Sequence, residues 1–146
     1  MNDIDALRGI IHGCGLFSPE EADGFAGSLL HLLADPAQHW RIVHRGDEAV
    51  GAAYLSLDGM SEDVWNLWFI ALLPDVRGHG GGTRLLSAAE QAARAGGGRM
   101  LLVETSSAEG QDAARAFYAA RGYDEEGRVR DYYTPGEAKV IFRRLV

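Results

Sequence analysis

Residues 76–86, VRGHGGGTRLL, place an arginine and four glycines directly before a helical pattern. Residues 64–73, VWNLWFIALL, are apolar on both faces, which is typical of a strand in the middle of a sheet. A strand, a glycine-rich loop and a helix in this order bring unpaired N–H groups together, where the helix dipole favours an anion. Glycine has no Cβ, so a bulky phosphate can approach the backbone. The stretch therefore predicts an α/β protein with a diphosphate site.

Two common phosphate-binding loops do not fit this stretch. The nucleoside triphosphate loop needs a lysine after its last glycine, but Thr83 follows Gly82 directly. The dinucleotide fingerprint needs a third glycine where this chain has Thr83 or Leu85, depending on the starting glycine. The interpretations left open are a phosphate loop of another type and a glycine-rich structural turn.

Helical and strand patterns alternate along the rest of the chain. A capping box of Ser18 and Glu21 begins one helix, and Gly122 ends another. Helices are predicted at residues 4–11, 18–34, 85–95 and 112–121, and strands at residues 40–45, 49–57, 64–73, 99–105, 123–133 and 139–146. No repeat, linker or low-complexity tract interrupts the pattern, so residues 1–146 are predicted to form one domain.

Composition narrows the classes of function. The formal net charge of −7 disfavours nucleic acid and mildly favours cationic partners such as amines. Cys14 is the only cysteine, which excludes an intramolecular disulfide and a cysteine zinc cluster and fits a cytoplasmic location. Asp3 and Asp5 stand where a secretory signal would be basic. We expect an untargeted chain with no membrane span and, from the spacing of its five histidines, no metal site.

Two motifs carry a resemblance to a known family. Arg77, Gly80 and Gly82 form R-x-x-G-x-G, and residues 113–123, AARAFYAARGY, follow one buried strand later. In order, spacing and intervening elements, residues 40–146 resemble the GNAT superfamily of N-acetyltransferases, and the closing segment RDYYTPGEAKVIFRRL resembles the last hairpin of a bacterial GNAT subgroup.

The resemblance implies a mixed, mostly antiparallel sheet of six to seven strands, with about four helices on its two faces and splayed central strands. Residues 1–36 would form helices that line the acceptor side, and residues 40–146 would hold the sheet, the cofactor loop and the catalytic helix. The family usually begins with a strand, but only Met1 and Asn2 precede the first helix here. A missing first strand leaves a sheet edge that a second subunit could cover, as in a homodimer.

The resemblance also implies that acetyl-CoA is the cosubstrate. Its pyrophosphate would bind the loop amides, and Arg77 would add charge or brace the loop. The pantetheine arm would pair with the backbone of Ile70, Ala71 and Leu72, where an N–H near Ile70 would face the thioester carbonyl. Gln111 stands where the family often has an asparagine that touches the arm. The loop residues in question are Gly78, His79, Gly80, Gly81, Gly82 and Thr83.

For catalysis, Tyr118 matches the general acid of the family, which protonates the coenzyme A thiolate as the amine displaces it. The alternative is a core tyrosine, but Phe117 precedes it and is expected to fill the core. Glu104 ends an apolar strand where the splay should open, so it is the candidate base, with relay through water as the alternative. Core packing is predicted for Trp65 and Trp68, which lie on opposite faces of their strand, so that at most one lines an acceptor pocket.

Together the motifs predict an N-acetyltransferase that moves an acetyl group to a primary amine of a small molecule or peptide by direct attack in a ternary complex. Cys14 lies outside both motifs, so no covalent intermediate is expected. Residues 13–20 and the hairpin after Tyr123 would wall the acceptor site. The alternative is a non-catalytic acyl-CoA binding or sensing module, which keeps the loop and does not need Tyr118.

Overall fold

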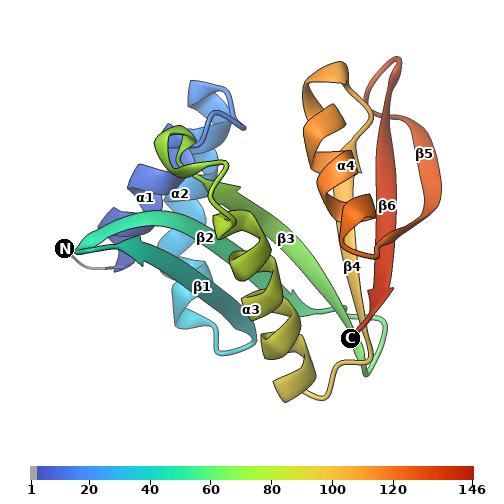
Figure 1. Ribbon diagram of the computed structural model, residues 1–146, viewed down its shortest axis with the longest axis horizontal. Helices are drawn as coiled ribbons and strands as arrows, with labels where there is room; N and C mark the ends of the chain where they lie inside the picture. Colours follow the sequence, from blue (N-terminus) through green and yellow to red (C-terminus); the bar gives the residue numbers. More distant parts are fainter. Residues whose placement is uncertain (1–2) are drawn as a thin grey trace.

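A six-stranded sheet with the strand order β1-β2-β3-β4-β6-β5 forms the centre of the protein (Figure 1). The computed structural model describes residues 3–146, so Met1 and Asn2, which were expected to precede the first helix, lie outside the described residues. The strands are β1 Gln38–Arg45, β2 Glu48–Leu57, β3 Val64–Leu72, β4 Met100–Ser106, β5 Asp124–Thr134 and β6 Glu137–Leu145. The helices are α1 Asp3–Gly13, α2 Pro19–Ala34, α3 Gly81–Ala95 and α4 Asp112–Ala120, with 3-10 turns at Pro74–Val76 and Glu109–Gln111.

The two central strands separate along their length. All neighbouring pairs are antiparallel except β3 and β4, which run parallel. These two strands pair only from Val64 with Met100 to Leu67 with Val103, although β3 continues to Leu72. Figure 1 shows β3 and β4 diverging toward the loop before α3 and the start of α4. The expected mixed sheet with splayed central strands is therefore confirmed.

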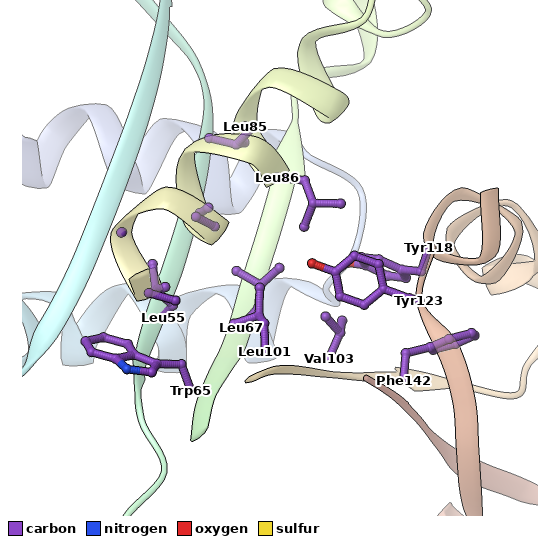
Figure 2. Packing of buried hydrophobic residues seen from close by; sticks show 14 of the residues in the cluster. Leu55, Trp65, Leu67, Leu85, Leu86, Leu101, Val103, Tyr118, Tyr123 and Phe142 are labelled. Carbon is purple, nitrogen blue, oxygen red and sulfur yellow. The ribbon is translucent and has the colours of Figure 1, made fainter. Parts of the chain in front are cut away.

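Two apolar clusters cover the two faces of the sheet. Helices α3 and α4 pack on one face, where Leu86, Leu101 and Phe142 are buried together (Figure 2). Helices α1 and α2 pack on the other face, where Ile10 and Leu29 meet residues of β2 and β3. The helices thus lie two on each face, in agreement with the expected arrangement.

Trp65 and Trp68 lie on opposite faces of β3, as predicted, and differ in burial on either side of a bulge. Tyr54 of β2 is opposite Phe69 while Leu55 is opposite Leu67, so Trp68 is an extra residue in the pairing. Trp65 is buried in the α3 face, as predicted. The Trp68 side chain is 50% exposed, so the prediction of core packing is wrong for this residue. Simple alternation along a strand cannot reveal a bulge.

An ion pair between the first two helices provides a test of their packing. The His12 imidazole contacts the Asp23 carboxylate and the Arg8 carbonyl, each at 2.9 Å. The hydrogen bond to Asp23, followed by that to Arg8, raises the pKa of His12 above 6.5. This pair therefore stabilises the fold fully below about pH 6.5, and its contribution is lost as the pH rises through the higher folded-state pKa.

We expect the NMR titration midpoint of His12 to lie above 6.5 in the native protein and to fall in Asp23→Asn. Because the pair is exposed, added salt should also lower the midpoint. An unchanged midpoint in Asp23→Asn would contradict the pairing of α1 with α2 through this histidine.

The described residues 3–146 contain neither a candidate membrane-spanning helix nor a candidate metal cluster. No helix in this range is long and apolar enough to span a bilayer. No three histidine, cysteine, aspartate or glutamate side chains within it are grouped so that they could hold a metal ion. Cys14 is buried and unpaired.

Candidate active site

A cavity of about 460 Å³ lies at the open side of the splay between β3 and α4. Its walls come from the connection between α1 and α2, the end of β3, the glycine loop and the first turns of α4. It contains seven of the residues predicted to bind the cofactor: Ile70, Ala71, Leu72, Arg77, Gly82, Gln111 and Tyr118. Segments far apart in the sequence therefore meet at one site.

The end of β3 presents unpaired backbone to this opening. The N–H of Leu73 donates to the Val50 carbonyl of β2 at 2.8 Å, so Leu73 faces β2. Because backbone groups alternate sides along a strand, Leu72 and Ile70 face the other way, where pairing with β4 has already ended. The Leu72 carbonyl agrees with this, since it accepts from Arg77 on that side. The N–H of Ile70 is thus oriented toward the cavity.

The glycine loop begins α3 with no side-chain cap. Gly80 is the N-cap residue at φ 80°, and Gly78 is also left-handed at φ 85°, a backbone conformation that favours glycine. A Cβ on Gly82 would lie 3.3 Å from the Phe117 ring of α4. The loop therefore needs glycine both for its turn and for its close approach to α4. The first N–H groups of α3 remain without a side-chain partner, which is the arrangement that binds anions.

Two arginines brace the loop from opposite sides. Arg77 donates to the Leu72 carbonyl at 3.0 Å and to the Cys14 carbonyl at 2.5 Å, which joins β3 to the connection between α1 and α2. Arg121 donates to the Thr83 hydroxyl at 2.8 Å and lies 3.8 Å from the centre of the Phe117 ring. Arg77 thus braces the loop, one of the two roles considered from the sequence.

Some of the predicted loop residues lie outside this cavity. Gly78, Gly80 and Thr83 do not line it. His79 and Gly81 line a separate cavity of about 390 Å³ that borders β1, β2 and α3. Of the loop, Arg77 and Gly82 line the first cavity, while Gly78 and Gly80 take the left-handed conformation of the turn.

Tyr118 occupies the junction between α4 and the sheet. Its ring is 4% exposed and packs against Tyr123 and Phe142, with ring centres 5.7 and 5.8 Å apart (Figure 2). Burial raises the pKa of its phenol well above the usual value of 10. Phe117, which was expected to fill the core, is instead only partly buried and faces the cavity. Helix α4 therefore places the Tyr118 ring in the core and the Phe117 ring at the cavity, which is the reverse of the expected arrangement.

A second cavity of about 230 Å³ lies on the other side of Tyr118, between β3 and β4. The two cavities share five residues, Leu16, Ile70, Gln111, Ala114 and Tyr118. The Ile70 backbone and the Tyr118 side chain consequently stand where the cavities meet. The two cavities are therefore neighbours at these two residues.

Glu104 lines the smaller cavity, at the place where β4 leaves β3. Its side chain is 32% exposed and pairs with the Lys139 ammonium of β6 at 3.4 Å. The carboxylate is therefore more exposed than the sequence suggested. Thr105, the next residue, has a buried hydroxyl without a hydrogen-bond partner among the described residues.

Tyr133 lines the smaller cavity and belongs to the hairpin after Tyr123 that was expected to wall the acceptor site, although the sequence did not single this residue out. Strand β5 has extra residues between Val129 and Thr134, so the β5–β6 pairing is interrupted there. Within this bulge Asp131 has φ 56° and accepts a hydrogen bond from the Gly136 N–H at 2.7 Å. The turn TPGE predicted the hairpin, but no residue in the sequence signals a left-handed aspartate.

Comparison with known proteins agrees with this geometry. The family model described as the acetyltransferase (GNAT) family matches residues 6–123. The aminoalkylphosphonate N-acetyltransferase of Salmonella typhimurium is 34% identical over 106 residues, which cover 70% of this chain and 65% of that relative. The chain thus spans about two thirds of the length of this relative.

Solved structures share the fold over nearly the whole chain. A protein from Desulfovibrio desulfuricans assigned to the GNAT family has a TM-score of 0.92 and 29% identity, covering 98% of this chain and 92% of its own. An aminoglycoside 6′-N-acetyltransferase complexed with coenzyme A has a TM-score of 0.82 and 17% identity, covering 99% and 92%. Because the family model matches most of the residues that build the sheet, the loop and α4, this chain belongs to the GNAT family of acetyltransferases.

Proposed function

We propose that this acyltransferase moves the acetyl group of acetyl-CoA to a primary amine by direct attack in a ternary complex. The observation that carries the proposal is that Ile70 and Tyr118 line both of two neighbouring cavities. One cavity opens toward the glycine loop and would hold the pantetheine arm. The other borders Glu104 and would hold the amine.

The residues of the larger cavity fit acetyl-CoA, which when bound supplies an acetyl thioester. The uncapped N–H groups at the start of α3 would bind the two phosphates. The unpaired backbone of Ile70 and Leu72 would pair with the amides of the pantetheine arm, as a neighbouring strand does. Gln111, at the start of α4, lines the same cavity and would contact the arm.

Ile70 and Tyr118, which line both cavities, would have separate roles in the reaction. The Ile70 N–H would donate to the acetyl oxygen as it gains negative charge, an interaction that contributes about 3 kcal/mol in other acyl-transfer enzymes. As the amine nitrogen bonds to the acetyl carbon and the carbon–sulfur bond breaks, the Tyr118 hydroxyl would give its proton to the departing thiolate. This phenol carries its proton at neutral pH, since even an exposed tyrosine ionises only near pH 10 and burial raises the pKa of Tyr118 further.

Glu104 would accept the proton that the amine loses. It is the only carboxylate among the described residues that line the smaller cavity. Its side chain is 32% exposed, so water can reach the carboxylate. The tyrosinate left at position 118 would recover its proton through the same water, so no net charge is gained or lost.

Assaying a panel of primary amines for release of free thiol from acetyl-CoA tests this function. We expect release to depend on the amine and to be matched by an equal amount of acetylated product. Binding of acetyl-CoA without release for any amine or amino-terminal peptide would instead support the non-catalytic binding module.

A further inference from the structure

A third cavity, of about 600 Å³, lies between α2 and β3 on the face opposite α3. We call it the aromatic trough, because five of its walls are the rings of Phe17, Phe25, Tyr54, Trp68 and Phe69. It also contains Glu21, near the start of α2. Of these rings, Trp68 is half exposed and so is accessible to a molecule in the trough.

The trough continues into the smaller cavity of the active site. The two share four walls, Leu16, Phe17, Trp68 and Phe69. The bulge in β3 is the cause, because it inserts Trp68 beside Phe69 where both border the two cavities. The trough therefore lies next to the smaller cavity, which Tyr118 also lines.

The rings of the trough are held in place before anything binds. The Trp68 indole N–H donates to the Ser56 hydroxyl at 2.8 Å, which fixes the plane of an otherwise exposed ring. Tyr54 stacks on Trp40 with ring centres 4.6 Å apart, and Phe25 meets Phe69 edge to face at 5.2 Å. Rigid walls lose little conformational freedom when a flat molecule packs against them.

The ionised side chains in the walls of these two cavities are acidic, and one of them, Glu104, is paired with the Lys139 ammonium at 3.4 Å. No lysine, arginine or histidine of residues 3–146 lines the trough or the smaller cavity. The ionised walls are Glu21 at the exposed end and Glu104 at the active-site end. A phosphonate or carboxylate bound here would leave water without a cationic partner, which is costly.

We propose that the acceptor is a primary amine joined by a short linker to a flat, uncharged apolar body, such as an arylalkylamine. The body would lie between the rings of Trp68 and Phe25, and the amine would reach the junction at Tyr118. This inference rests on the proposed function and adds the substrate class. It separates this chain from its relative named for aminoalkylphosphonates, whose acceptor carries an anionic group by that name.

A diamine is the competing acceptor, with its second ammonium at Glu21. One oxygen of Glu21 already accepts from the Ser18 N–H at 2.9 Å in the helix cap, and the side chain is exposed. An exposed carboxylate that is already hydrogen-bonded contributes little to binding a second ammonium. We therefore expect the aromatic rings, rather than Glu21, to determine which amine is preferred.

The test compares four amines at equal concentration: 2-phenylethylamine, n-propylamine, 1,4-diaminobutane and 2-aminoethylphosphonate. We expect kcat/KM for 2-phenylethylamine to exceed that for each of the others at least about tenfold. In a binding assay without turnover, 2-phenylethylamine should also raise the Tm of the protein saturated with coenzyme A more than the others do. A preference for the phosphonate or the diamine in either assay would overturn the inference.

Two variants test whether the trough is the source of the preference for an aromatic amine. In Trp68→Ala the ratio of kcat/KM for 2-phenylethylamine over n-propylamine should fall at least about tenfold, while stabilisation by acetyl-CoA remains, because Trp68 does not line the larger cavity. The control Leu30→Ala removes a 70% exposed side chain of α2 outside the cavities and should leave the ratio unchanged. An unchanged ratio in Trp68→Ala would overturn the inference.

The proposed function and this inference fail differently. If no amine releases thiol although acetyl-CoA binds, the proposed function fails, and the Tm comparison still decides whether the trough prefers an aromatic amine. If amines are acetylated without preference for the aromatic one, the transferase stands and the trough assignment is wrong.

Discussion

Replacing Tyr118 with phenylalanine is expected to lower kcat for acetyl transfer about a hundredfold, with little change in acetyl-CoA affinity. General acids contribute about 10²–10⁴ to enzymatic rates. The ring packs against Tyr123 and Phe142, and phenylalanine keeps that packing while it removes only the hydroxyl. Steady-state kinetics with the preferred amine gives kcat, and thermal stabilisation by acetyl-CoA reports cofactor affinity.

Tyr123→Phe is the matched control for this experiment. Tyr123 lies in the same ring cluster, lines none of the cavities described above, and has a buried hydroxyl without a partner among residues 3–146. Removing an unpaired buried hydroxyl should maintain or raise the free energy of unfolding by up to about 1 kcal/mol and leave kcat as it is. Equal activity of Tyr118→Phe and Tyr123→Phe would remove Tyr118 from the mechanism.

The pH dependence offers a second view of Tyr118. Burial raises its pKa, so the phenol keeps its proton as the pH rises through the range where an exposed tyrosine ionises. We therefore expect no alkaline decline of kcat due to this group up to about pH 10. A decline that begins near pH 8 and disappears in Tyr118→Phe would contradict that protonation state.

Gly80→Val is expected to abolish the stabilisation that acetyl-CoA gives the native protein. Gly80 begins α3 at φ 80° with open space where a Cβ would lie, so valine meets no atom but strains the backbone by about 1–2 kcal/mol or more. Relief of that strain would turn the first amides of α3 away from the cavity. At free acetyl-CoA about a hundredfold above Kd, the native protein should gain about 2.7 kcal/mol, which is lost in the variant.

Gly97→Val separates backbone strain from cofactor binding. Gly97 follows the other end of α3, with φ 84° and no atom within 4 Å of the position that a Cβ would take. Both variants should lose similar amounts of stability, measured by urea unfolding, but only Gly80→Val should lose the response to acetyl-CoA. If Gly80→Val keeps the full thermal shift, the loop is a structural turn.

Local patterns in the sequence predicted most of the fold. The capping box of Ser18 and Glu21 is present in the structure, with both hydrogen bonds formed. The glycines after α3 end that helix as predicted, and Gly96 and Gly98 lie so close to the Trp65 indole that no side chain fits there. Helix caps and turns involve neighbours in the chain, so the sequence states them directly.

The candidate site was predictable only in outline. The motifs led to Tyr118, Gln111 and the loop, but periodicity did not reveal the bulge at Trp68 in β3. The sequence also does not fix how α4 is rotated about its axis, and Phe117 faces the cavity instead of the core. Strand β5 hides a similar irregularity at Asp131. Bulges and rotations depend on contacts between distant segments, which single-sequence patterns do not record.

The short pairing of β3 with β4 has a mechanical consequence. Among the described residues, backbone hydrogen bonds tie the first three strands to the last three only from Asp63, whose carbonyl accepts from Arg99 and Met100, to Leu67 opposite Val103. Beyond Leu67, β3 and β4 form no further backbone pairs. The amides of a bound pantetheine arm would form the hydrogen bonds that are missing there. The cosubstrate would thus act as an additional strand beside β3 while it is positioned for reaction. Release of coenzyme A would then break hydrogen bonds that help to hold the two halves of the sheet together. The release rate would therefore depend on how readily β3 and β4 move apart.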